Sequence, residues 1–151
     1  MSQEIQDVQP VLYDEFVLET TDLQVIRSLG DPPTNIVLFT DPFDIALTFQ
    51  GQPLPVTSVW WMMKNTNQPF RIDYYAESLD PNPDVTLGSI NAVLSLAFDI
   101  YSSVNPPANR TTLTVAAGAV PRGIYRLSAK LTFTNFVGWT GFFEGDAFQV
   151  V

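Results

Sequence analysis

The sequence predicts an all-β protein, and three observations carry that prediction. Residues 122–134 alternate between apolar side chains on one face and polar or basic side chains on the other, which is the pattern of a half-buried strand. Twelve prolines and eight glycines divide the chain into short segments. No long segment keeps a helical apolar period. A chain of 151 residues is long enough for one domain with a packed core.

The N-terminal segment has a composition of its own. Residues 1–22 carry six acidic side chains and no Lys or Arg. Apolar residues are interspersed among them, which favours an extended arm that docks over a free tail. A first strand is possible over residues 23–29, where Gly30 and the residues that follow it end the segment. We therefore divide the chain into an acidic N-terminal arm with a possible first strand, 1–30, and a domain, 31–151.

The domain contains further segments that predict strands, each bounded by turn residues. They are residues 35–40, 43–50, 56–64, 70–77, 92–101, 110–116, 124–134 and 142–151. Segment 56–64 is apolar on both faces, so we expect it to be covered on both. Residues 80–84 form a loop, because their two prolines lack an amide donor and fix φ. Short strands at this spacing predict a Greek-key β-sandwich of about seven to nine antiparallel strands.

Residues 121–127, Pro-Arg-Gly-Ile-Tyr-Arg-Leu, resemble the Gly-x-Tyr-x-Leu signature of the penultimate strand in bacterial immunoglobulin-like and fibronectin-like β-sandwich domains. The last five residues, 147–151, resemble the closing strand of these domains, and the resemblance covers residues 35–151. It implies an immunoglobulin-like sandwich without a disulfide. It says almost nothing about function, because such sandwiches serve many roles.

The resemblance also implies structural roles for particular residues. The hydroxyl of Tyr125 is expected to bond a backbone group at the corner of the sandwich. Leu47 and Leu127 would stand where disulfide-containing relatives keep their cysteines. The position of the core tryptophan stays open between Phe70 and the pair Trp60 and Trp61.

The residue inventory argues against catalysis. The chain has no His and no Cys, which excludes the usual nucleophilic triads and the usual zinc sites. It has no phosphate-binding loop and no dinucleotide fingerprint. Asp73 and Glu77 share a strand face and could flank a glycoside, but paired carboxylates on a strand are more often a solvated surface. We expect no enzyme activity, no catalytic residue and no cofactor.

The charge of the chain limits its partners. The formal net charge is −9 and the seven basic residues are dispersed, so we expect no nucleic-acid binding. The longest apolar run, residues 90–100, is too short to span a bilayer, which predicts no membrane insertion. The N-terminus lacks the features of a signal peptide, and a chain without cysteine suits a reducing compartment. We expect a cytoplasmic protein.

Residues 80–84 are a weak candidate for a metal site. Asp80, Asn82 and Asp84 place oxygen side chains at alternate positions, and Ca²⁺ needs several oxygens from one loop. The segment lacks the glycine and the downstream glutamate of an EF-hand. Asx residues and prolines that form a turn are the favoured interpretation, so we expect no metal.

Aromatic residues supply the candidate partner-binding positions. Phe136, Trp139, Phe142 and Phe143 lie in a glycine-hinged connection, and such residues are good anchors at interface centres. In the alternative interpretation these rings cap the open end of the sandwich, which is favoured for Phe142 and Phe143 and stays open for Trp139. Trp60 and Trp61 have the same two interpretations.

The basic side chains of one strand form a candidate electrostatic docking face. Arg122, Arg126 and Lys130 fall on the polar face of segment 122–134, and their charge complements the acidic arm. The arm could lie across this face in its own subunit or in a neighbouring one, where exchange would build an oligomer. In the alternative interpretation this face is a solvated edge that discourages unwanted strand pairing.

These observations favour a non-catalytic interaction or structural module that binds another protein or assembles with itself through its sandwich-end loops and its arm. A small-ligand binding module is an alternative, in which Trp139, Trp60 or Tyr75 stacks on a carbohydrate. A Ca²⁺-assisted binding module that uses the 80–84 loop is another.

Overall fold

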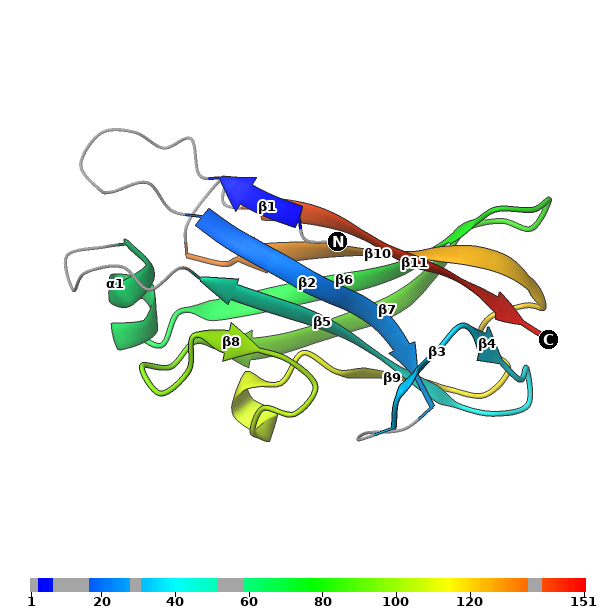
Figure 1. The fold of residues 1–151 in the computed structure, drawn as a ribbon, viewed down its shortest axis with the longest axis horizontal. Helices are drawn as coiled ribbons and strands as arrows, with labels where there is room; N and C mark the ends of the chain where they lie inside the picture. The colour runs from blue at the N-terminus through cyan, green and yellow to red at the C-terminus, as the bar shows by residue number, and fades with distance from the viewer. Residues whose placement is uncertain (1–2, 7–16, 28–30, 52–58, 136–139) are drawn as a thin grey trace.

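The structure is a computed structural model that describes residues 3–6, 17–27, 31–51, 59–135 and 140–151. In these ranges the chain forms two β-sheets that pack face to face, together with one short α-helix and one 3₁₀ turn, η1 (Pro107–Asn109) (Figure 1). The predicted all-β class is confirmed. Neither described helix is long and apolar enough to cross a membrane.

The first sheet, called sheet A, has the strand order β1-β2-β5-β8, with β3 beside β2 and β9 beside β5. Its strands are β1 (Gln3–Gln6), β2 (Val17–Ile26), β3 (Pro33–Thr34), β5 (Phe43–Gly51), β8 (Ile100–Tyr101) and β9 (Leu113–Val115). The two N-terminal strands come from the segment that the sequence assigned to an arm. β2 begins earlier than the predicted first strand and pairs with β5 along most of its length.

The second sheet, called sheet B, has the strand order β4-β11-β10-β6-β7. Its strands are β4 (Ile36–Val37), β6 (Pro69–Ser78), β7 (Val85–Val93), β10 (Gly123–Phe133) and β11 (Thr140–Val150). β4 runs parallel to β11, so the expectation of antiparallel strands is wrong for this pair. The remaining pairs in the two sheets are antiparallel.

The core lies between the two sheets, and β10 shows how the sequence builds it. Its inward side chains are all buried: Tyr125, Leu127, Ala129, Leu131 and Phe133. The polar side chains between them face outward, as the alternation predicts. Leu47 of β5 and Leu127 of β10 are both buried, on opposite sheets. Phe70 is fully buried and meets Phe49 edge to face, with ring centroids 5.4 Å apart.

The segment around Trp60 is a helix and not the predicted strand. Within the expected strand 56–64, the described residues begin α1 (Val59–Asn65). Trp60 and Met63 are three residues apart and both are buried, so they share one face of the helix. Asn67 ends the helix at φ 50°, and the amide of Gln68 donates to the carbonyl of Met63 at 2.9 Å. This helix is too short to show a helical apolar period in the sequence.

The other strand that the sequence misplaced is β7. We expected a strand at 92–101, whereas β7 covers residues 85–93 and only two residues of β8 lie near 101. The pairing of β6 with β7 slips between Tyr74 and Tyr75, because β7 has a bulge next to Gly88. The inward positions change phase at this bulge, from Val85 to Ile90. A search for uninterrupted alternation therefore misses the strand.

The two sheets contact each other at both long sides of the sandwich. On one side β11 meets β2, where a Cβ on Gly145 would lie 2.6 Å from the carbonyl oxygen of Leu23. Only a residue without a side chain permits this approach. On the other side β7 meets β9, and the side chain of Leu113 lies against Gly88. Beside the contact of β11 with β2 lies a cavity of about 350 Å³, which residues of β2 and β3 line on one sheet and residues of β10 and β11 on the other.

Candidate functional site

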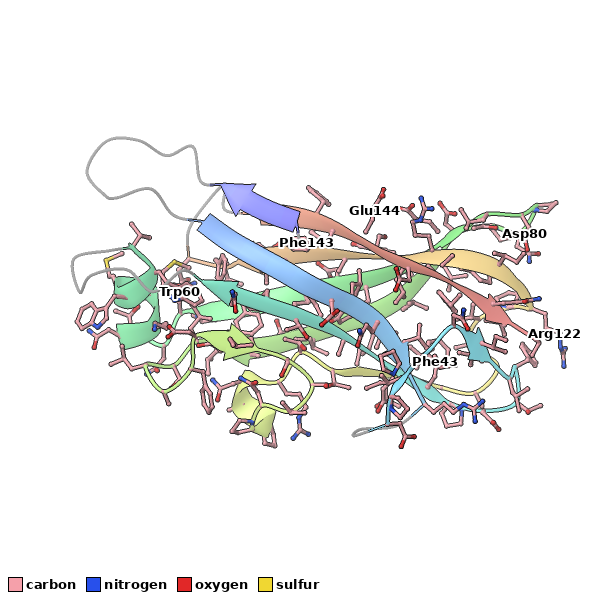
Figure 2. The ribbon with its side chains drawn as sticks, in the orientation of Figure 1. Phe43, Trp60, Asp80, Arg122, Phe143 and Glu144 are labelled. Carbon is pink, nitrogen blue, oxygen red and sulfur yellow. The ribbon has the colours of Figure 1, made fainter. Side chains whose placement is uncertain are left out.

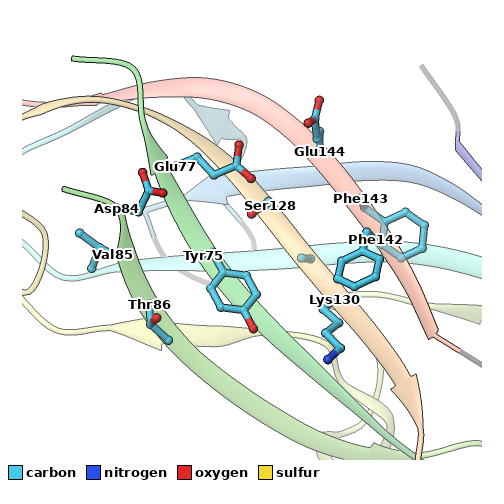
Figure 3. Close-up of a pocket in the computed structure, with 11 residues that line it drawn as sticks. Tyr75, Glu77, Asp84, Val85, Thr86, Ser128, Lys130, Phe142, Phe143 and Glu144 are labelled. Carbon is cyan, nitrogen blue, oxygen red and sulfur yellow. The ribbon is translucent and has the colours of Figure 1, made fainter. Parts of the chain in front are cut away.

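A groove with a volume of about 680 Å³ lies on the outer face of sheet B (Figure 3). Outward side chains of neighbouring strands line it, among them Tyr75, Glu77, Ser128, Lys130, Phe142 and Glu144. These residues come from β6, β10 and β11, so strand pairing assembles the groove. The sequence shows the outward positions of each strand, but it does not show which strands are neighbours.

The register of sheet B fixes the positions across the groove. Ser128 on β10 lies opposite Tyr75 on one side and opposite Glu144 on the other. Lys130, two residues further along, lies opposite Phe142. Tyr75 and Phe142 therefore stand on the two strands that flank β10, about 10 Å apart across the sheet. Two aromatic rings and several polar groups share one rigid surface.

Phe142 and Phe143 are neighbours in sequence with opposite environments. The side chain of Phe143 is 2% exposed and belongs to the core, whereas Phe142 is 73% exposed in the groove. Strand alternation produces this difference. The ammonium of Lys130 lies 5.8 Å from the centroid of the Phe142 ring, within the range of a cation–π contact. Because Phe143 is buried, it is not available to contact a partner. Phe142 is exposed, so its ring does not cap the core.

The expected cationic face has acidic neighbours. In the register, Glu77 lies opposite Arg126 and Asp73 lies opposite Lys130. Opposite charges at these cross-strand positions attract one another, so the face carries mixed charge and is not the basic patch that the sequence of β10 indicated. The third basic residue, Arg122, lies away from the groove, with its guanidinium carbon 4.4 Å from the centroid of the Phe39 ring (Figure 2).

Asp73 is held in its ionised form beside this face. Burial alone would raise the pKa of its carboxyl group, but hydrogen bonds from Ser89 and Arg71 and the positive charges of Arg71 and Lys130 outweigh burial, so the pKa lies below its usual value. Arg71 Nε lies 2.9 Å from Asp73 Oδ1. Asp73 thus belongs to a local charge network at the edge of the face.

The acidic arm does not lie across this face within the chain, as far as the structure describes it. Residues 3–6 and 17–26 form β1 and β2 of sheet A, which packs against the inner face of sheet B. The basic side chains of Arg126 and Lys130 belong to the outer face. These described residues therefore pair within sheet A, and docking of the arm on the basic face, in its own subunit or a neighbouring one, stays a prediction.

Trp60 is a structural residue at the opposite end of the molecule from Asp80 and Arg122 (Figure 2). It is 1% exposed, its indole Nε1 donates to Asp99 Oδ1 at 3.3 Å, and the ammonium of Lys64 pairs with the same oxygen. The hydrogen bond from Lys64, aided by that from Trp60, lowers the pKa of Asp99 despite burial. Burial excludes Trp60 from partner binding, and its neighbour Trp61 is half-buried.

The loop at 80–84 uses its polar side chains for internal hydrogen bonds. Asp80 accepts from the amides of Asn82 at 3.0 Å and Ile124 at 2.9 Å, and these bonds lower the pKa of its carboxyl group. Asp84 accepts from the amide of Ser78 at 2.7 Å. In the described part of the chain, no group of three or more His, Cys, Asp or Glu side chains could hold a metal ion. The bond from the Asn82 amide to the Asp80 carboxylate is that of an Asx turn.

This loop explains the glycine of the sequence signature. A Cβ on Gly123 would lie 2.4 Å from Asn82 Nδ2 and 2.6 Å from Asp80 Oδ2. Nearby, the hydroxyl of Tyr125 donates to the carbonyl of Pro121 at 2.8 Å, a backbone bond of the kind that the resemblance implied. Gly123 and Tyr125 therefore fix the start of β10 against the loop between β6 and β7.

The groove contains some of the residues that the sequence singled out and lacks others. Tyr75, Phe142 and Lys130 were candidates and line it, whereas Ser128 was not a candidate. Only knowledge of the strand neighbours could have added Ser128. The candidates Phe136 and Trp139 lie outside the described residues. No family model matches the chain, and no curated protein is significantly similar to it in sequence.

Proposed function

We propose that this protein is a non-catalytic binding module that holds its ligand in the groove on the outer face of sheet B. The exposure of Phe142 carries the proposal. An aromatic ring that is 73% exposed forgoes most of the free energy that burial would provide, about 25 cal/mol per Å² of apolar surface. The core next to it is filled by Phe143. A ligand that covers the Phe142 ring would recover this free energy.

The proposed role suits the residues of the groove. Several groups with different hydrogen-bonding character surround the ring, and their strands hold them in place. Ligand sites commonly combine apolar contact with a few polar groups that set orientation, in volumes of about 300–1,000 Å³. The whole chain lacks His and Cys, which supports binding over catalysis.

We infer that the scaffold follows the immunoglobulin-like order. The order β4-β11-β10-β6-β7, with a short early strand parallel to the last strand, supports this inference. The place of Tyr125 on the penultimate strand supports it as well. A crystal structure in which β4 pairs elsewhere than with β11 would contradict it.

The binding role is tested by capturing ligands and changing Phe142. The immobilised protein is screened against a glycan array and a random peptide library, and every hit is measured again with the Phe142→Ala and Val104→Ala variants. Val104 is 78% exposed on the loop after β8, so it controls for the loss of an exposed apolar side chain. We expect hits that Phe142→Ala weakens about tenfold or more and Val104→Ala leaves unchanged. A screen whose hits are all insensitive to Phe142→Ala, or that yields no hit, would refute this role.

Self-association is a second candidate, and a different part of the same sheet favours it. Ile36, Leu79 and Ile124 are each 44–50% exposed at the end of sheet B near the 80–84 loop. Ile36 is on β4, Ile124 is on β10, and Leu79 directly follows β6 and donates its amide to the carbonyl of Ile124. A second copy could cover these aliphatic side chains. Sedimentation velocity over a concentration series should then show a dimer that Ile124→Asp dissociates; a monomer at every concentration would exclude it.

A further inference from the structure

The polar groups around Phe142 and Tyr75 restrict the chemistry of a ligand that lies on them. A wholly apolar ligand would cover Glu77, Ser128 and Lys130 without offering them hydrogen bonds, which costs free energy. Carboxylates only accept hydrogen bonds, ammonium groups only donate them, and a hydroxyl does both. A ligand with many hydroxyl groups can satisfy all three kinds of group at once.

The two rings add a second requirement. Tyr75 and Phe142 are separated by β10, so a ligand that covers both must extend about 10 Å across the sheet. It must also present an apolar face to each ring while its edges stay polar. A sugar ring has this character, with C–H groups on its faces and hydroxyl groups around its rim. An oligosaccharide repeats it along an extended chain.

The charges on this face argue against strongly charged ligands. Arg126 and Lys130 have Glu77 and Asp73 as cross-strand neighbours, so the basic groups are matched locally. The net charge of −9 repels polyanions, and nucleic-acid binding needs clustered basic side chains. A protein partner is less favoured, because a stable interface needs a larger apolar centre than the exposed ring of Phe142 provides.

We propose that the groove binds a neutral oligosaccharide, with the rings of Phe142 and Tyr75 against sugar faces and with Ser128, Glu77 and Lys130 bonded to sugar hydroxyl groups. This inference rests on the proposed binding function. Phe142 on β11 provides one apolar contact, and Tyr75 on β6 provides another. The ligand therefore places at least two sugar units in the groove. The binding is non-covalent and leaves the sugar unchanged.

Isothermal titration calorimetry with defined probes tests the ligand class. The neutral probes are tetrasaccharides of cellulose, xylan, mannan and starch, the anionic probe is a galacturonic acid tetramer, and the cationic probe is a tetralysine peptide. We expect at least one neutral probe to bind. We expect Phe142→Ala and Tyr75→Ala each to weaken it about tenfold, which is about 1.4 kcal/mol. Phe142→Trp, which keeps an aromatic ring, should retain binding within about threefold.

A matched control separates the groove from the rest of the sheet face. Gln149→Ala removes an exposed side chain from the same outer face, on β11 and outside the groove, and should leave the affinity unchanged. If only a charged probe binds and Phe142→Ala abolishes that binding, the ligand class is wrong while the binding function stands. If no probe binding depends on Phe142, both fail. Circular dichroism of each variant confirms that it is folded.

Discussion

The hydroxyl oxygen of Tyr74, on β6 of sheet B, lies 3.1 Å from the amide nitrogen of Leu47, on β5 of sheet A. The same hydroxyl donates to the carbonyl of Thr111 at 2.5 Å. Two short strands pair with the same edge of β5: β8 with one end and β9 with the other. The amide of Leu47 lies in the gap between these two strands. The side chain of Tyr74 takes the place of a strand at this gap and joins the two sheets.

Tyr74→Phe should therefore destabilise the protein. The substitution leaves two buried backbone groups, at Leu47 and Thr111, without this partner, and an unsatisfied buried group costs about 1–3 kcal/mol. Urea unfolding followed by tryptophan fluorescence measures the loss. Tyr75→Phe removes an outward hydroxyl from the same strand and should change the free energy of unfolding by less than about 0.5 kcal/mol. Equal stabilities of the two variants would contradict the role of Tyr74.

Phe142→Ala and Phe143→Ala should separate binding from stability. Phe143 is 2% exposed, so its truncation leaves a cavity and should cost about 3–5 kcal/mol. Phe142 is exposed, and its truncation should cost less than about 0.5 kcal/mol. Thermal unfolding of both variants tests this difference. A large loss of stability in Phe142→Ala would show that the ring supports the fold.

Gly123→Ala should push the 80–84 loop away from β10. The new methyl group would meet Asn82 and Asp80, whose hydrogen bonds hold the loop, and such overpacking costs about 1–3 kcal/mol. The same substitution is then made in an Asp80→Ala/Asn82→Ala background. Without the two side chains, Gly123→Ala should be close to neutral, because Ala is better than Gly inside a strand. If Gly123→Ala lowers the free energy of unfolding in urea by the same amount in both backgrounds, the contact of this position with Asp80 and Asn82 is contradicted.

Asp80 should make stability depend on pH in the acid range. Hydrogen bonds from the amides of Asn82 and Ile124 lower its pKa in the folded state below the ordinary value of 3.8. The stability that its carboxylate provides is therefore present above about pH 4 and is lost as the pH falls through the folded pKa. Wild type should exceed Asp80→Asn in urea midpoint at pH 6, and the difference should shrink below pH 4. A difference that stays constant down to pH 2 would contradict this assignment.

The sequence predicted the elements whose alternation is unbroken. β10 and β5 follow the predicted pattern, because each successive side chain changes face without interruption. β7 was missed because its bulge at Gly88 changes the phase of the inward positions. The sequence predicted a strand where α1 lies. A short apolar run is equally compatible with a short helix and with a strand that is covered on both faces.

The groove itself could be predicted only in part. Tyr75 and Phe142 were recognisable as aromatic candidates, but their common site depends on the order of β6, β10 and β11. The same order explains why the basic face of β10 is matched by acids. Glu77 is 49 positions from Arg126 in sequence, and only sheet pairing brings the two into register. Long-range pairing of this kind leaves no local signal in a single sequence.

The strand alternation of sheet B separates its residues into two independent sets. The inward side chains of β10 pack in the core, whereas its outward side chains do not belong to that packing. Evolution can therefore vary the outward side chains of sheet B without altering the packed interior. The same property makes this sheet a scaffold for engineering, in which new specificities are selected on the surface while the fold is kept.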